Sequence, residues 1–271
     1  ADLSGGNLAH ADLTDADLSG VDFTGGDLSG ADFSGVDFSD ATLPGVNHNP
    51  VSHKGNPVPA DMTDADLSGV DLSGANLSGA NLSGADLSNA NLSGVDLRPA
   101  SHDGYSIDTH MKRAVLSDTD LSDANLSSVD LSNADLINAD LTSTDFSDAD
   151  LSGANLTGSD LSDADLSGVD SSNADFSDAN LSNASLSAAT LVHATLINAT
   201  LSDADFSGAN LTRAALSDAD LSGANLSDTT LSFVGLSGAN LSDATLSGAN
   251  LSSAELGLSS NNGQYEHTVL T

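Results

Sequence analysis

Leucine or phenylalanine recurs every five residues over most of this 271-residue chain, in units that read ADLSG or ANLSG. On an α-helix, five residues advance by about 500°, so successive leucines would spread around the whole axis. On a flat strand, an odd step places successive leucines on opposite faces. The spacing therefore favours a chain that turns a corner every five residues, because only a stack of such coils buries every leucine.

The residues around each leucine suit such a coil. A small residue, usually alanine, stands two positions before it, and Ser, Gly, Asn and Asp, which favour turns, follow it. Ser171 breaks the pattern, because it stands where a leucine is expected. We expect a small cavity or a water-filled defect at this serine.

The tandem A[DN]LSx units resemble those of the pentapeptide-repeat proteins. The resemblance implies an all-β fold, a right-handed quadrilateral parallel β-helix (a pentapeptide-repeat solenoid) with about twenty residues per coil. We expect one continuous domain. Its segments are predicted as β-helix at 1–43, 61–97 and 114–257, loops or irregular coils at 44–60 and 98–113, and a C-terminal tail at 258–271.

Two interruptions have the same length, because Leu43 is as far from Met62 as Leu97 is from Leu116. Two interpretations fit this spacing. Each segment is an extra loop, in which case both loops leave the coil at the same corner, or each replaces one irregular coil.

The interruptions hold four of the five basic residues and several histidines. Imidazole is a common metal ligand, but basic loops on an acidic coil are expected to form salt bridges instead. We therefore predict loop contacts without a metal or a cofactor. The predicted loop-contact residues are His48, His53, Lys54, Arg98, His102, Tyr105, Lys112 and Arg113.

The formal net charge is -35, from 40 acidic and 5 basic residues, which argues against direct binding of nucleic acid. Aspartates twenty positions apart, such as Asp120 and Asp140, are expected to stack, at a cost of about 1 kcal/mol per pair even in water. Asn and Thr in some columns, high salt, or weakly bound divalent cations would relieve this repulsion. The excess of Asp over Lys favours a protein of a salt-loving organism. No apolar run is long enough to span a membrane.

The segment from Ala179 to Ser202 contains no acidic residue. In a twenty-residue coil, His193, Arg213 and Phe233 fall in one outward column. Val192 lies beside His193, and Ile197 lies on another face. These five residues are predicted to form a protein-binding patch. The alternative is that the segment only dilutes like charge, since its threonines suit strands.

No catalytic constellation is evident, and the outward faces are convex, so we predict that the protein is not an enzyme. We expect a rigid acidic rod that serves as a structural or protein-docking module, in a surface fibre or larger assembly. A protein partner or self-association is expected. The predicted location is extracellular, on the cell surface or virion of a halophile.

The alternative is an inhibitor of a type II topoisomerase that mimics DNA, because the chain resembles quinolone-resistance proteins in two features. It carries two early interruptions, and its charge along the coil axis approaches that of B-DNA, about one charge per 1.7 Å. Its tail, GLSSNNGQYEHTVLT, lacks the apolar helix that those proteins use to dimerise. This alternative implies a cytoplasmic location.

Overall fold

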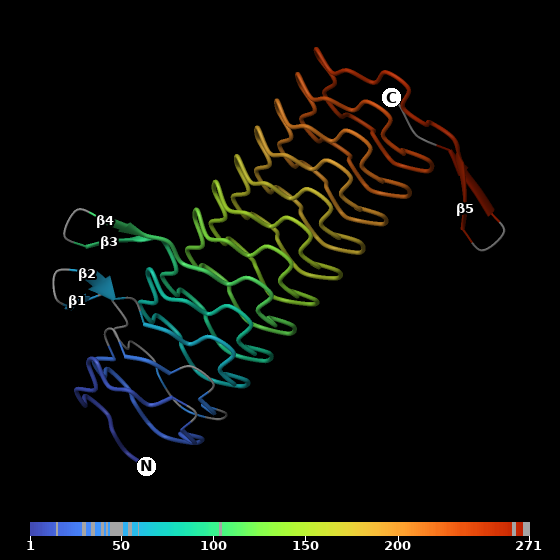
Figure 1. Cartoon of the computed structure of the whole chain (residues 1–271). Coiled ribbons are helices and arrows are strands. Elements are labelled where there is room, and N and C mark those ends of the chain that lie inside the picture. Colours follow the sequence, from blue (N-terminus) through green and yellow to red (C-terminus); the bar gives the residue numbers. More distant parts are fainter. Residues whose placement is uncertain are drawn as a thin grey trace. The chain divides into compact units, whose positions relative to one another are not determined.

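The backbone turns after every fifth residue, and four turns complete one coil. The computed structural model describes residues 1–14, 16–28, 31–33, 36–38, 41, 43, 51–53, 56–58, 60–102, 105–261 and 264–267. These residues form two compact units, 1–140 and 141–271, in each of which successive coils stack against one another (Figure 1). The residue before each leucine forms a parallel one-residue bridge with its counterpart twenty positions on, as in Asp145↔Asp165.

Each corner is a tight β-turn. At one example, the Ala194 N–H donates to the Leu191 carbonyl at 3.1 Å, and His193 between them has a φ of 62°. A positive φ at the third residue of such a turn is typical of type II. Gly, Asn and Asp adopt this backbone most easily, which explains their frequency at this position of the repeat.

The aspartate or asparagine before each leucine fixes the following turn. Asp120 Oδ1 accepts hydrogen bonds from the backbone N–H and the hydroxyl of Ser122, at 3.0 and 2.6 Å. Asn180 accepts the same pair from Ser182. Since one carbonyl-type oxygen serves both bonds, Asp and Asn are interchangeable here, and the hydroxyl bond explains why Ser or Thr usually follows the leucine.

Leucine, phenylalanine and alanine fill the inside of the coils. Leu121 and Leu126, which lie five residues apart, are both fully buried, so the expectation that every corner turns its leucine inward is confirmed. Ser171 is also fully buried, and its hydroxyl has no hydrogen-bond partner. The leucine position of this unit therefore holds an unpaired polar group.

The named strands of the described residues belong to three antiparallel hairpins rather than to the coils. They are β1 (Val51–His53) with β2 (Asn56–Val58), β3 (Ala100–His102) with β4 (Tyr105–Ile107), and β5 (Leu258–Asn261) with β6 (Gln264–His267). The coil pairs through single residues because a turn follows too soon for a longer strand. The hairpin β5–β6 lies in the segment predicted as a tail.

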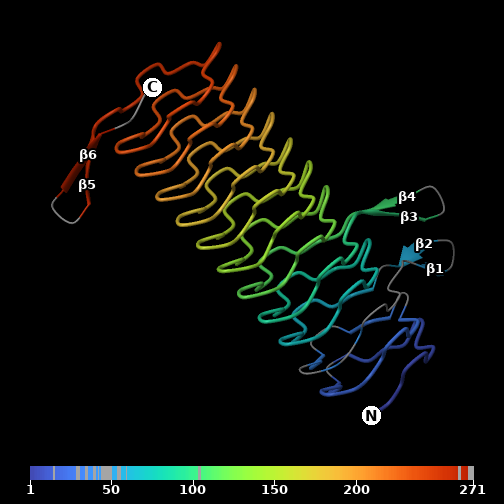
Figure 2. The same cartoon turned by 180° about the vertical axis from the view of Figure 1, so that it is seen from behind.

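The first two hairpins leave the first unit on the same side (Figures 1 and 2). Asp61, Asn81 and His110 bridge in succession, so the chain re-enters the coil at one corner after each hairpin. The bridges Asp32↔Asp61 and Asn81↔His110 span 29 residues each, which is one twenty-residue coil plus nine inserted residues. This register agrees with extra loops at a single corner.

The second insertion is shorter than the repeat spacing predicts. The Gly79 N–H donates to the Arg98 carbonyl, and the Thr109 hydroxyl bonds to both groups. Thr109 and Met111 are fully buried in the coil. The β-helix therefore continues through Arg98 and resumes at Thr109 rather than at 114. The sequence prediction missed this start because His110, Lys112 and Arg113 around Met111 differ from the usual residues of the repeat. No helix among the described residues is long and apolar enough to cross a membrane.

Candidate interaction surfaces

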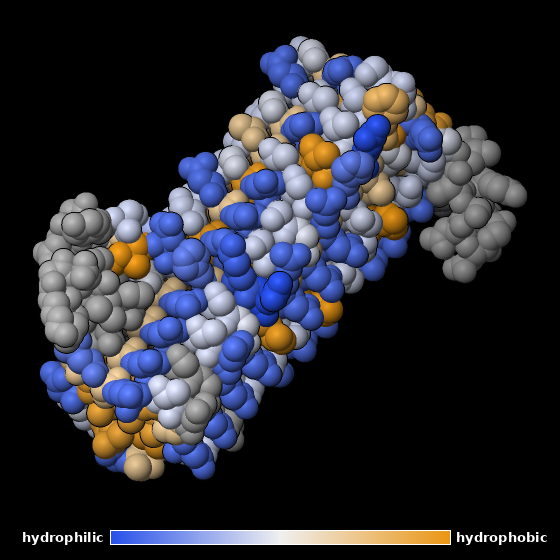
Figure 3. Space-filling view, in the orientation of Figure 1, coloured by the Kyte–Doolittle hydropathy of each residue, from blue (hydrophilic) through white to orange (hydrophobic). Residues whose placement is uncertain are grey.

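Carboxylates stand at outward positions along the coils, and Figure 3 shows hydrophilic residues gathered in rows across successive coils. At several places where Asn follows Asp in the next coil, the Asn amide donates to the carboxylate, as from Asn180 to Asp160 at 2.9 Å. Asn225 and Asn240 donate to their neighbours in the same way. The expectation that asparagines interrupt the columns is confirmed, and these bonds show how they relieve like-charge repulsion.

The corner positions of the second unit avoid adjacent aspartates altogether. Each corner Asp between 143 and 253 is followed, one coil later, by Asn or Gly. Asn198 donates to Asp178 at 3.2 Å, whereas the carboxylate of Asp203 lies where a side chain on Gly223 would begin. The corner columns therefore space their carboxylates by at least two coils.

The basic residues beside the second hairpin pair with nearby carboxylates, Arg98 within its own coil and Lys112 with the next coil. Arg98 donates through Nε and an Nη nitrogen to both oxygens of Asp96, at 2.9 and 2.8 Å. These hydrogen bonds, aided by the arginine charge, hold the pKa of Asp96 below its ordinary value against the effect of burial. Lys112 Nζ lies 2.9 Å from Asp130 Oδ2. Burial raises the pKa of Asp130, but the hydrogen bonds of Lys112 and Ser132 and the lysine charge together lower it further than burial raises it.

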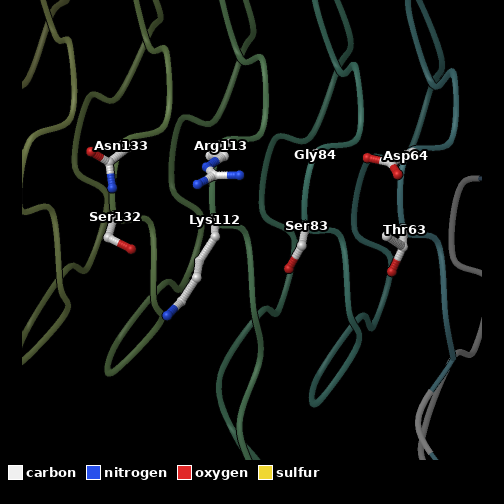
Figure 4. Close-up of a pocket in the computed structure, with 8 residues that line it drawn as sticks. All are labelled: Thr63, Asp64, Ser83, Gly84, Lys112, Arg113, Ser132 and Asn133. Atoms are coloured by element: carbon white, nitrogen blue, oxygen red, sulfur yellow. The ribbon is translucent and has the colours of Figure 1, made fainter.

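A shallow hollow of about 500 Å³ lies at the corner of the first unit that carries Lys112 and Arg113. Figure 4 shows Arg113 and Asp64 on either side of Gly84 along one row of corner residues. The hollow is polar and open, and it has a basic half and an acidic half. Its lining consists of Thr63, Asp64, Ser83, Gly84, Lys112, Arg113, Ser132 and Asn133.

The remaining loop residues are placed less completely. His48 and Lys54 lie outside the described residues, as do the side chains of His53, His102 and Tyr105. His110 belongs to the coil, and its buried Nδ1 has no hydrogen-bond partner. In the part of the chain that the structure describes, no three His, Asp or Glu side chains are grouped to hold a metal ion.

One corner column of the second unit carries large side chains without any acid. His193, Arg213 and Phe233 occupy the same corner on three successive coils, with φ values of 62°, 61° and 59°. The His193 N–H donates to the carbonyl before Arg213, and the Arg213 N–H to the carbonyl before Phe233. The Arg213 guanidinium carbon lies 5.5 Å from the centroid of the Phe233 ring, which is a cation–π contact. The structure thus places these three residues in the column that the spacing predicts.

The face that follows this corner is also neutral. Thr195, Ala215 and Gly235 bridge in succession at positions where other coils carry Asp or Asn, and the nearest acids in their column are Asp175 and Glu255. We call the six residues of this corner and face the neutral strip: His193, Arg213, Phe233, Thr195, Ala215 and Gly235.

Two large hydrophobic side chains of the neutral strip and its border are exposed. Phe233 is 55% exposed, and Ile197, which borders the face on its far edge, is 37% exposed. Val192, beside His193, is half-buried. Thr195 was considered from the sequence only among the threonines that dilute charge. Ala215 and Gly235 were not singled out, although their small size at positions twenty residues apart is visible there.

Comparison with known proteins agrees with this architecture. A family model for pentapeptide repeats matches the chain in eight copies, and the matched residues include 1–40, 60–98 and 119–258. None of the curated proteins matches.

Solved structures of pentapeptide-repeat proteins resemble the chain. HetL of the cyanobacterium Nostoc sp. strain PCC 7120, involved in heterocyst differentiation regulation, is 34% identical over 91% of this chain and 90% of its own, with a TM-score of 0.39. Full-length QnrB1, a plasmid-mediated fluoroquinolone resistance protein, is 20% identical over 73% of this chain and 92% of its own, with a TM-score of 0.47. With its repeats, its turns and its register of twenty residues per coil, the chain belongs to the pentapeptide repeat family, whose fold is a right-handed β-helix solenoid.

Proposed function

We propose that this protein is a non-enzymatic docking module, a rigid acidic β-helix that serves a larger assembly such as a surface fibre. The carboxylates stand on the outside of the coils rather than in an enclosed cleft, the usual setting of a catalytic acid or base. The repeat fixes side chains in regular rows, which suits recognition of another protein surface.

The observation that carries this proposal is the neutral strip. On a chain with a net charge of -35, three successive coils present a corner and a face without a single carboxylate. Phe233 is exposed there and lies against Arg213. Aromatic and arginine side chains are the residues that most often dominate the binding energy of interfaces.

The test places charge on this surface. We expect Phe233→Asp combined with Ile197→Asp to weaken assembly and partner binding by at least about thirtyfold, the loss expected for a central interface residue. Ala188→Asp is the matched control, because it adds a carboxylate at an exposed corner of the same coil as His193, between Gly168 and Gly208 in its column. Equal binding by the wild type, the Phe233→Asp/Ile197→Asp double variant and Ala188→Asp would contradict the proposal.

We also propose that the protein is adapted to high salt. Asp145 bridges Asp165, and Asp150 bridges Asp170, so like charges stand on adjacent coils. Molar salt shortens the Debye length to about 3 Å and screens such pairs. The melting temperature is expected to rise between low and molar NaCl, and Asp150→Asn should raise it mainly at low salt. A melting temperature independent of salt would contradict this adaptation.

The alternative function, mimicry of DNA toward a type II topoisomerase, is favoured by two observations. The surface is strongly acidic, and both early hairpins leave one corner of the first unit. Inhibition of gyrase supercoiling at low micromolar protein, with salt matched to the protein-free reaction, would support it, and the absence of inhibition would end it. The predicted locations, outside the cell for the docking module and cytoplasmic for the mimic, stay predictions.

A further inference from the structure

Two edges flank the face Thr195–Ala215–Gly235, and their residues differ in a complementary way. One edge is the corner with His193, Arg213 and Phe233. The opposite corner carries three other residues at the same coil levels, with φ values of 59°, 61° and 76°: Asn198, Asp218 and Gly238. At the middle level, a cation on one edge therefore stands across the face from a carboxylate on the other.

A two-fold axis parallel to the coil axis would exchange these edges. When two copies meet face to face about such an axis, each Arg213 stands opposite Asp218 of the second copy. One level further on, each Phe233 stands opposite Gly238, which has no side chain. The pairing is isologous, so every contact occurs twice.

We propose that the neutral strip is the dimer interface of this chain, with a second copy packed in parallel about this two-fold axis. This inference rests on the proposed docking function and names the partner. The face is suited to close approach, because Ala215 and Gly235 have the smallest side chains and the space above Gly235 is open.

The distribution of charge favours a second copy of this chain as the partner and favours the parallel orientation. A basic partner would bind the aspartate columns rather than the one surface that carries Arg213, whereas a second acidic copy is repelled from those columns. Arg213 forms no ion pair within the described part of its own chain, so it can supply a new one. An antiparallel pairing centred on Ala215 would set Arg213 against Arg213, which disfavours it.

The ends of the interface predict its response to salt. In the parallel pairing, Asp175 of one copy faces Asp175 of the other, and Glu255 faces Glu255. These repulsions are screened by salt. Dimerisation should therefore strengthen as NaCl rises to the molar range, and Asp175→Asn should strengthen it at low salt.

Sedimentation velocity over a range of protein concentrations tests the proposal on the full chain. Arg213→Asp and Asp218→Arg should each weaken dimerisation by at least about tenfold, since each reverses one charge in two symmetric pairs. The double variant restores both pairs in the opposite sense and should recover the wild-type constant within about threefold. Arg113→Asp, the same change at an exposed corner of the first unit, should leave dimerisation unchanged, and melting curves check that each variant folds.

A wild-type protein that stays monomeric in molar salt would overturn the dimer, as would a double variant no better than the single ones. An effect of Arg113→Asp equal to that of Arg213→Asp would also overturn it, because the charge would then act without regard to position. None of these results would decide the docking function, which the Phe233→Asp and Ile197→Asp test addresses separately with other partners.

Discussion

The base of the second hairpin and the corner of the neutral strip both carry basic side chains where most units have small polar ones, but these basic side chains have different surroundings. Arg98 pairs with a carboxylate of its own coil, and Lys112 pairs with one of the next coil. Arg213 instead lies over the exposed ring of Phe233. The difference shows that a basic side chain in a broken repeat is either matched by a carboxylate of the chain or left exposed, and the proposed docking function concerns the exposed one.

The largest expected effect comes from breaking the base of the hairpin. Thr109→Val removes the buried hydroxyl that joins the Gly79 N–H to the Arg98 carbonyl, and we expect a loss of about 1–3 kcal/mol in the free energy of unfolding. Thr195→Val on the neutral strip should change it by no more than about 0.5 kcal/mol, because that side chain is partly exposed. Urea unfolding of both variants measures the contrast, and equal losses would refute it.

A second contrast separates backbone strain from crowding at the corners. Gly208→Ala, at φ 69° with open space around it, should cost about 1 kcal/mol from the left-handed backbone alone. Gly223→Ala also meets the carboxylate of Asp203 and should cost about 1 kcal/mol more. Adding Asp203→Ala should remove this excess, and thermal unfolding of the set measures it. An excess that persists without the carboxylate would contradict this reading of the corner columns.

The smallest expected effect concerns the ion pair of Lys112. Lys112→Met should cost about 0.2–1 kcal/mol at neutral pH, as for other exposed pairs. The pKa of Asp130 is lowered in the folded protein. The ionised Asp130 therefore stabilises the folded state fully at pH values above its unfolded-state pKa of about 3.9, and this stabilisation is lost as pH falls through its folded-state pKa.

The difference in the free energy of unfolding between wild type and Lys112→Met should therefore shrink in acid and vanish below the folded-state pKa of Asp130. Arg213→Met, measured by the same denaturation at each pH, should show no such dependence, because Arg213 has no carboxylate partner in the described part of its chain. A pH dependence of the same size in both variants would contradict the comparison.

Much of the coil follows from the repeat itself. A period of five leaves no other way to bury both Leu121 and Leu126, and a register of twenty then places His193, Arg213 and Phe233 together. The cation–π contact is different, because it depends on side-chain rotamers that spacing does not specify. The hydrogen bonds from Ser to Asp explain why these two residues recur in each unit. Predicting these bonds requires the geometry of the turn, which the spacing alone does not specify.

The second insertion was harder to delimit from the sequence. Met111 fills a leucine position and Thr109 fits the small-residue position before it, but His110, Lys112 and Arg113 differ from the residues usual at their positions. The structural constraint there is the buried hydroxyl of Thr109, whose two partners lie 30 and 11 residues away. Such contacts between distant residues leave no periodic signal, which is also why the hairpins were expected only as loops.

Thiol labelling tests the central claim most directly, because the chain contains no cysteine. Phe233→Cys and Ala188→Cys each place one thiol at an exposed corner, the first within the neutral strip and the second outside it. The account predicts that labelling at position 233 slows as protein concentration or a bound partner covers the strip, while labelling at position 188 stays constant. Equal rates at both positions under every condition, or protection at position 188 alone, would contradict it.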